Sequence, residues 1–433
     1  MKTFILVGAL VMTMLLVASV FASSNRHALR GAKKRQQGVS STGILQVQVI
    51  SRHGDRLPTS SAQIPKDPVN WPLVSGFSLG DLTGLGQKEC YKLGKKLRAR
   101  YLRDRSPSQI QGITEHYNAT HYLFRSTNFD RALNSMVSIA QGLFPPGTGN
   151  RAIKKYRNPE QDLHRGQFSL PHGVQSVPIH TVADNMENLL LGFTYCNTVQ
   201  KRTQTAFITR VFPYIAARRT FFDRLYNETG WTGGDATIST LIDLLQVQKY
   251  HDMIHIDWVN ENWHLLEQYR DEILLILYGY DVIGKEGSSI LITTLLDNIA
   301  QFKKKYIHYS AHDSTLQALA AALRLNDADS GFSMGLPKYG AHFVLELHQM
   351  NDGNRTVRLL YGEKYDSEHL TPLVLAKLGC ESEFCPLATF KAGAELHGTT
   401  GSTPWCEACA NKSQDVCAPY FLKNVPPCPT PAA

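Results

Sequence analysis

The first 40 residues of this 433-residue chain contain no acidic residue. They contain six cationic ones, and these account for most of the formal net charge of +8. Subtracting the six leaves +2 for the rest of the chain, so net charge gives no reason to expect nucleic-acid binding. The chain also lacks an internal repeat, a low-complexity tract outside its ends and a phosphate-binding P-loop. It therefore has the composition of an ordinary globular protein.

The acid-free segment has the features of a secretory signal peptide over residues 1–22. An apolar run from Phe4 to Phe21 follows a basic start, and Val20 and Ala22 stand where a cleavage site requires small residues. A signal anchor is the alternative, because the run is almost long enough to span a bilayer. We favour a cleaved signal and thus the secretory pathway, with either secretion or the lysosomal lumen as destination.

Two other tail segments leave alternatives open. Lys33-Lys34-Arg35 is either a processing site or a solvent-exposed basic tail, and we favour the tail. The C-terminal tail lacks an apolar span, so no C-terminal membrane anchor is expected.

Cysteine is scarce, with eight residues in the chain. This number excludes a small fold built on disulfides but fits a few stabilising bridges in an exported protein. Cys90 falls on the apolar face of a predicted helix, so we expect a buried free thiol. Export also makes Asn-x-Ser/Thr sites available for glycosylation, namely Asn118, Asn227, Asn354 and Asn411.

Strand and helix patterns alternate towards both ends of the chain, whereas the middle is mostly helical. Strand patterns cover 44–50, 121–128 and 306–313, helical patterns follow from about 84 to 105 and over 314–325, and 342–363 has the pattern of a hairpin. We therefore predict an α/β fold with a central, mostly parallel sheet flanked by helices. Residues 43–150 and 301–433 form this domain, and residues 151–300 form a mostly helical insertion or cap domain.

A cluster of basic residues follows the first strand pattern directly. Arg52 and Arg56 repel each other and need an anion or a carboxylate between them. Their charge disfavours the cationic imidazole, so the pKa of His53 should be low and the ring should stay a nucleophile in acid. This combination suits attack on a phosphoryl group.

The other two strand patterns also end in polar residues next to a helix start. Arg125 ends one, and His312 and Asp313 end the other. Helix N-termini favour anions, and open α/β sheets bind ligands beyond the carboxyl ends of their parallel strands. If these ends are neighbours, the arginines and His312 surround one phosphate, and Asp313 is the acid that can protonate a leaving oxygen.

These residues resemble a known family. Residues 52–58, Arg-His-Gly-Asp-Arg-Leu-Pro, match the Arg-His-Gly-x-Arg-x-Pro signature of the histidine acid phosphatases, and His312-Asp313 resembles that family's C-terminal His-Asp pair. The segments "LTGLGQKECYKLG" (82–94), "RSTNFDRALNS" (125–135) and "GLFPP" (142–146) are similar to family segments in the same order. The chain is thus identified as a member of this family within the phosphoglycerate-mutase-like superfamily, and it resembles the prostatic and lysosomal types.

The resemblance implies a hydrolase of small phosphate monoesters that works in acid through a phosphohistidine on His53. Asp313 would donate a proton to the leaving alcohol and then act as the base for water. The phosphate would be held by four residues, Arg52, Arg56, Arg125 and His312. No metal and no other cofactor is expected, and the oligomeric state stays open because homodimers occur in such enzymes.

The resemblance also implies two disulfides, Cys380–Cys385 and Cys196–Cys409. It leaves the pairing of the remaining tail cysteines open, namely Cys406, Cys417 and Cys428.

Three alternative functions remain. A phytase or a lysophosphatidate phosphatase of the same family would share the phosphate site and differ in the walls that the insertion supplies. A catalytically silent secreted binding protein on the same scaffold is the third, and the intact His53 and Asp313 argue against it.

Two further sets of residues are interpreted as structural. "YHDMIH" (250–255) suggests a metal site through His251, Asp252 and His255, but no further ligand set accompanies it, and we expect helix surface instead. Arg131 is interpreted as a solvent-exposed or structural arginine.

Overall fold

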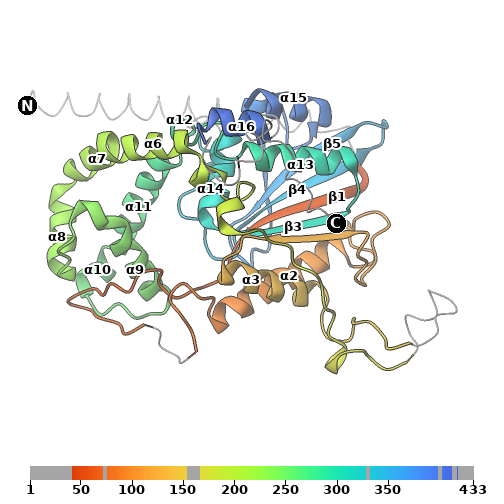
Figure 1. Ribbon diagram of the computed structural model, residues 1–433, viewed down its shortest axis with the longest axis horizontal. Helices are drawn as coiled ribbons and strands as arrows, with labels where there is room; N and C mark the ends of the chain where they lie inside the picture. Colours follow the sequence, from red (N-terminus) through yellow and green to blue (C-terminus); the bar gives the residue numbers. More distant parts are fainter. Residues whose placement is uncertain are drawn as a thin grey trace, which may run out of the picture.

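The computed structural model describes residues 41–71, 76–153, 166–327, 332–397, 402–411 and Cys417. The predicted signal peptide, the basic segment 33–35 and Cys428 lie outside these residues. A β-sheet with helices on both faces forms one part of the molecule, and a group of helices forms the other (Figure 1). Within the described ranges, no helix is long and apolar enough to cross a membrane.

The sheet has the strand order β2–β3–β1–β4–β5–β6, and β7 pairs with β5. Its strands are β1 (Ser41–Arg52), β2 (Tyr122–Ser126), β3 (Tyr306–Ala311), β4 (His342–Met350), β5 (Arg355–Gly362), β6 (Thr371–Leu373) and β7 (Cys385–Pro386). The first three strands are parallel to one another, and the remaining pairs are antiparallel. The predicted α/β class with a helical insertion is confirmed. The sheet is mixed rather than mostly parallel, because the predicted hairpin, β4–β5, pairs with β1 in the antiparallel sense.

Helices cover both faces of the sheet (Figure 1). One face packs against α2 (Gly84–Tyr101) and α3 (Asp130–Leu143). The other packs against α13 (Ser289–Gln301), α14 (Asp313–Ala322) and α15 (Leu387–His397). Because both faces are covered, the strands are apolar on both sides and their sequences do not alternate cleanly.

Helix α2 follows its predicted pattern closely. It begins after Thr83, whose side chain accepts a hydrogen bond from the Gly86 N–H, and it ends four residues before the predicted Arg105. Its apolar face, which includes Leu93 and Leu97, is buried against the sheet. Cys90 on the same face is a buried free thiol, which confirms that prediction.

The helical insertion has a core of its own. Its helices are α5 (Gly192–Tyr195), α6 (Asn197–Ala206), α7 (Phe212–Ala216), α8 (Arg219–Thr229), α9 (Ile238–Tyr250), α10 (Asp257–Glu261), α11 (Trp263–Leu277) and α12 (Tyr280–Ile283). Phe222, Leu241 and Leu245 are fully buried there, and they do not belong to the apolar cores on the sheet. The insertion can therefore present its own wall to the sheet edge. The predicted domain boundaries at residues 150 and 300 stay a prediction.

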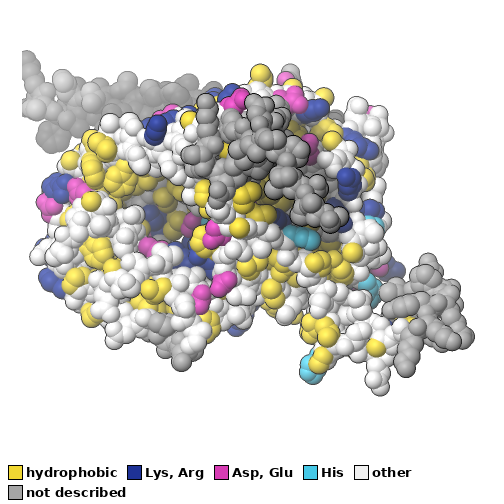
Figure 2. Space-filling model, in the orientation of Figure 1, with side chains coloured by type: hydrophobic (Ala, Val, Ile, Leu, Met, Phe, Trp, Pro, Cys, Tyr) yellow, Lys and Arg dark blue, Asp and Glu magenta, His cyan; other side chains and the backbone are white. Residues whose placement is uncertain are grey.

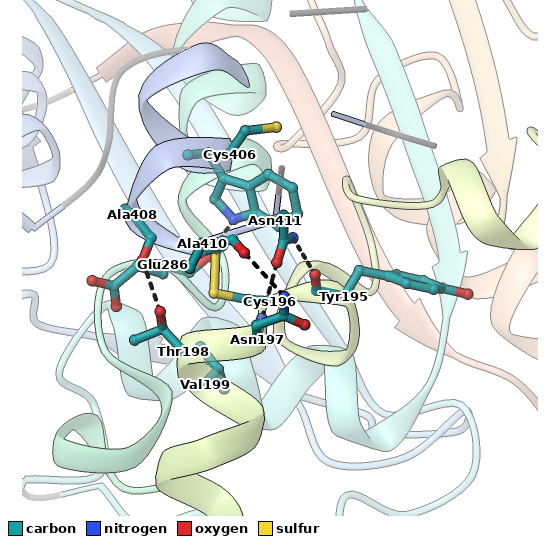
Figure 3. Close-up of a disulfide and its surroundings, with 12 residues drawn as sticks. Tyr195, Cys196, Asn197, Thr198, Val199, Glu286, Cys406, Ala408, Ala410 and Asn411 are labelled. Atoms are coloured by element: carbon teal, nitrogen blue, oxygen red, sulfur yellow. Dashed lines mark hydrogen bonds between the residues drawn. A yellow bond between two sulfur atoms is a disulfide. The ribbon is translucent and has the colours of Figure 1, made fainter. Parts of the chain in front are cut away.

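Three disulfides lie within the described residues, Cys196–Cys409, Cys380–Cys385 and Cys406–Cys417. The first two confirm the pairings that the resemblance implied, and the third resolves part of what it left open. Cys196–Cys409 ties the start of the insertion to the segment that follows α16 (Ser402–Ala408) (Figure 3).

One predicted glycosylation site is wrong. The Asn411 side chain is fully buried, its amide donates to the Tyr195 carbonyl, and its oxygen accepts from the Asn197 N–H (Figure 3). A glycan cannot occupy that position in this fold. Asn118, Asn227 and Asn354 are exposed, and glycosylation there stays a prediction.

Candidate active site

The predicted site residues meet at the carboxyl edge of the parallel strands. Arg52 at the end of β1 is in register with Ala311 at the end of β3, so His53 and the His312-Asp313 pair leave the sheet beside each other. Ser126 of β2 is in register with Ser310, which brings Thr127 to the same edge. The site therefore lies where open α/β sheets bind ligands.

His53 is held as a neutral ring with one free nitrogen. It is buried, and its Nδ1 lies 2.7 Å from the Gly54 carbonyl oxygen. Because a carbonyl only accepts, Nδ1 carries the proton and Nε2 keeps its lone pair. Burial, reinforced by the charges of Arg52 and Arg131 and by His312, holds the pKa of His53 well below its usual value. Nε2 is therefore available as a nucleophile in acid.

The loop after His53 depends on a glycine. A Cβ on Gly54 would lie 2.4 Å from the Gly86 carbonyl oxygen, a distance that side chains do not tolerate. The Gly54 N–H donates to the Ser135 hydroxyl of α3 at 3.1 Å. The loop is thereby fixed between the start of α2 and the first turns of α3.

Arg52 and Asp313 form the central ion pair. Arg52 Nη2 lies 2.8 Å from Asp313 Oδ2, and the guanidinium lies 4.4 Å from the centre of the Tyr339 ring. Burial raises the pKa of Asp313, but the charges of Arg52 and Arg56 outweigh it and the net shift is downward. Without a ligand, Asp313 is thus a carboxylate rather than an acid ready to donate.

His312 packs edge-on to His53, with 5.5 Å between the ring centres. Its Nε2 lies 2.9 Å from the Thr127 hydroxyl, and its Nδ1 lies 3.5 Å from Arg131 Nη2. Burial, followed by the charge of Arg131, lowers the pKa of His312 to about 3. Both histidines are therefore neutral, and the positive charge of the site resides on arginines.

Arg125 is the prediction that the structure corrects. Its guanidinium pairs with the buried Glu187 at 2.5 Å and donates to the Ser126 carbonyl. Side chains alternate along a strand, and Arg125 shares a face of β2 with Leu123, which packs against the core on the α13–α14 side. Its charge is therefore neutralised away from His53.

Arg131 takes the place that was predicted for Arg125. It lies in the first turn of α3 and is one of the two arginines with the largest effect on the pKa of His53. Among the described residues, no carboxylate lies within ion-pair distance of it, and its Nε is buried without a hydrogen-bond partner. Burial and the neighbouring arginines lower its pKa to about 10. Arg131 is thus half-buried rather than solvent-exposed, and a half-buried guanidinium without a carboxylate partner is suited to an anion.

Arg56 is already occupied by a residue that sequence reasoning did not find. Its Nη2 lies 2.6 Å from Oδ1 of Asp243, which lies on α9 of the insertion. The Thr59 hydroxyl donates to the same carboxylate at 3.2 Å. No local sequence pattern predicts this pair, because its two residues are 187 positions apart.

A buried polar network connects residues 52–58, which we call the signature loop, to the insertion. Asp55 is fully buried and accepts from the Thr83 hydroxyl at 2.5 Å, while His251 Nε2 lies 3.0 Å from it. The Asp55 N–H donates to Glu89, which in turn accepts from the Tyr250 hydroxyl. The contact with Asp55 is the largest cause of the raised pKa of His251.

The expectation that the "YHDMIH" segment is plain helix surface is therefore wrong. His251 docks on the signature loop, and His255 contacts Asp67 at 3.0 Å. Across the part of the chain that the structure describes, no group of three or more His, Cys, Asp or Glu side chains could hold a metal ion.

Two cavities meet at Arg52 and Tyr339. One, of about 390 Å³, lies between the signature loop and helices α9 and α11, and Asp313, Arg56 and Asp243 line it. The other, of about 800 Å³, is also lined by Arg52 and Tyr339 and includes Glu363 and Lys364. Figure 2 shows charged side chains of both signs in the hollow between the two parts of the molecule. The smaller cavity thus joins the Arg52–Asp313 ion pair to the wall formed by the insertion.

Comparison with known proteins places the chain among known relatives. Residues 43–362 match the family described as Histidine phosphatase superfamily (branch 2). Prostatic acid phosphatase of Bos taurus is 31% identical over 394 residues, which cover 86% of this chain and 89% of that protein. Lysosomal acid phosphatase of Rattus norvegicus is 30% identical over 362 residues, covering 79% of this chain and 75% of that protein.

Solved structures show the same fold at low sequence identity. The phytase from Citrobacter braakii superposes with a TM-score of 0.59 at 16% identity, covering 84% of this chain and 99% of that chain. The apo form of Hafnia alvei phytase gives a TM-score of 0.59 at 14% identity, covering 85% and 98%.

Proposed function

Because the chain belongs to the histidine phosphatase superfamily (branch 2), we propose that it is an acid phosphatase that hydrolyses phosphate monoesters through a phosphohistidine. The observation that carries the proposal is the environment of His53. Its free Nε2 belongs to a buried neutral ring, and the charges of three guanidinium groups, from Arg52, Arg56 and Arg131, act on that ring and lower its pKa. The acid phosphatases among its relatives support the same reaction class.

In the first step, the arginines hold the phosphoryl oxygens and His53 Nε2 attacks phosphorus. A P–N bond forms, the bond from phosphorus to the ester oxygen breaks, and Asp313 gives its proton to that oxygen. The arginines stabilise the charge on the equatorial oxygens in the transition state. In the second step, water attacks the phosphohistidine and gives a proton to Asp313, the P–N bond breaks, and inorganic phosphate leaves.

To act as the acid, Asp313 must first take up a proton, because the charges of Arg52 and Arg56 lower its pKa. Binding of the negatively charged substrate favours this uptake. Three arginines and two carboxylates, Asp313 and Asp243, give the unliganded pocket a charge of about +1 when both histidines are neutral. A phosphate dianion would bring it to about −1, and one proton restores neutrality. A substrate that binds as a monoanion in acid carries this proton with it, since the second pKa of a phosphate ester is about 6.

A phosphatase assay on matched variants tests the proposal. The wild-type protein should hydrolyse p-nitrophenyl phosphate and 2-glycerophosphate at pH 5, and His53→Ala should lose activity on both. Equal activity of wild type and His53→Ala would overturn the proposal. Assays with phytate at the same pH separate a general phosphatase from a phytase, because the shared fold leaves the substrate open.

We also infer that the protein works in the secretory pathway. The predicted signal peptide, three disulfides and the prostatic and lysosomal relatives support this location. Treatment with peptide-N-glycosidase tests it, since removal of glycans from Asn118, Asn227 or Asn354 should increase the mobility of the protein expressed in animal cells. Unchanged mobility would argue against glycosylation at these sites.

A further inference from the structure

The carboxylate of Asp243 lines the cavity next to Arg56, where positive charge would favour the binding of a phosphate. Asp243 of α9 binds Arg56 through both oxygens, at 2.6 Å and 3.4 Å, and also accepts from the N–H and hydroxyl of Thr59. The partners are unequal in exposure, since the Arg56 side chain is buried and the Asp243 side chain is 24% exposed to the cavity. Asp243 is therefore a fixed negative charge at the edge of the phosphate site.

A bound phosphate competes with Asp243 for Arg56. The Nε atoms of Arg52 and Arg131 are buried and unpartnered, whereas both terminal nitrogens of Arg56 face the carboxylate. When phosphoryl oxygens take hydrogen bonds from Arg56, Asp243 loses part of its compensating charge. A positive group on the leaving alcohol would restore it, and a negative group would repel it.

The surroundings of Asp243 strengthen this effect. The cavity wall contributed by the insertion is mostly apolar, with Phe207, Ile238, Ile242, Ile273, Leu274 and Leu277. Charges interact more strongly beside such a wall than in water. Arg270 is the cation that the insertion contributes to this wall, and its guanidinium is already paired with Asp271 at 2.8 Å. When a phosphate binds Arg56, the charge on this wall that remains to be matched is thus that of Asp243.

We propose that Asp243 is a specificity-determining residue that selects phosphate monoesters whose leaving group carries a positive charge near the phosphate. The proposal rests on the phosphatase function proposed above and names the substrate class for that site. It predicts discrimination against leaving groups that carry carboxylates or further phosphates.

Three esters of equal length test the charge alone: O-phosphoethanolamine, 2-hydroxyethyl phosphate and 2-phosphoglycolate carry a positive, a neutral and a negative leaving group. For wild type at pH 5, kcat/KM should fall in that order, with about a tenfold difference between the first and the last. Asp243→Asn should reduce this ratio to about twofold, and Asp243→Glu should keep most of it. Asp223→Asn, which removes an exposed carboxylate elsewhere on the insertion, should leave the ratio unchanged.

The outcomes separate the two proposals. If wild type hydrolyses none of the esters and no aryl phosphate, the phosphatase function fails. If it hydrolyses them without the predicted order, or if Asp243→Asn keeps the wild-type ratio, the phosphatase function stands and the role of Asp243 is overturned. If Asp243→Asn does not fold, the wild-type order with the Asp243→Glu ratio decides. A purely structural role would lower the melting temperature of Asp243→Asn without changing the ratio.

Discussion

The Asp313 carboxylate lies 2.8 Å from the Arg52 guanidinium, so the proposed acid is neutralised by one of the groups proposed to hold the phosphate. In the proposed mechanism, phosphate binding to Arg52 would weaken this pair and raise the proton affinity of Asp313. We therefore propose that the ion pair couples substrate binding to protonation of the acid.

The first prediction concerns the proton itself. Binding of inorganic phosphate at pH 7.5 should take up about one proton, because the dianion inverts the charge of the pocket. Isothermal titration calorimetry in two buffers of different ionisation enthalpy measures this number. Release of protons, or no exchange at all, would contradict the charge balance that we derive for the site.

The second prediction concerns the role of Asp313. Asp313→Asn should lower kcat for 2-glycerophosphate by about 10²–10⁴-fold, because the leaving alkoxide is no longer protonated. The loss should be much smaller for p-nitrophenyl phosphate, whose leaving group needs little help. A loss of the same size for both esters would show that Asp313 does not act as the proton donor.

The third prediction compares two arginines that lie six positions apart in the chain. Arg131→Ala should raise KM for p-nitrophenyl phosphate and Ki for inorganic phosphate by about tenfold or more, since a charge-assisted contact is lost. Arg125→Ala should leave both constants near wild type but lower the free energy of unfolding by about 3–5 kcal/mol, because Glu187 is left buried and unpaired. Steady-state kinetics with urea unfolding separates the two effects. The reverse pattern would restore Arg125 to the phosphate site.

These two arginines also show where sequence reasoning stops. Arg52, His53 and Asp313 could be predicted because each lies next to the end of a strand whose apolar run is visible in the sequence. Arg125 met the same criterion, but a residue inside a strand points to one face or the other. When helices cover both faces, alternation does not reveal which one. Arg131 reaches the site from the first turn of a helix, and only the packing of α3 on the sheet shows it.

The insertion was harder to predict than the sheet domain. The helical character of the insertion was visible in the sequence. In the sheet domain, the predicted hairpin over 342–363 was placed correctly. The two residues through which the insertion touches the signature loop, Asp243 and His251, were not predicted as partners of Arg56 and Asp55. Contacts between segments almost 200 residues apart depend on how the two parts dock, which the sequence does not encode in any local period.

The fourth prediction concerns the contact between His251 and Asp55. The raised pKa of His251 means that the pair stabilises the fold fully below the ordinary histidine pKa and loses this contribution as pH rises through the folded-state pKa. His251→Asn should therefore lower the free energy of unfolding by about 1–3 kcal/mol at pH 5 and by less at pH 8.

Its matched control lies four residues away. His255→Asn changes an imidazole that is 74% exposed and also contacts an aspartate, so its effect should stay within about 0.5 kcal/mol at both pH values. Urea unfolding at pH 5 and pH 8 measures all three proteins. An effect of His251→Asn that grows with pH would have the wrong sign for this ion pair.

The central claim is that His53 carries the phosphoryl group during turnover, and rapid acid-free quenching of the enzyme with a ³²P-labelled phosphate ester tests it most directly. Wild type should retain an acid-labile, alkali-stable label that peptide mapping places on His53, and His53→Ala should retain none. A wild-type enzyme that turns over substrate without label on His53, or a His53→Ala variant that still becomes labelled, would contradict the account.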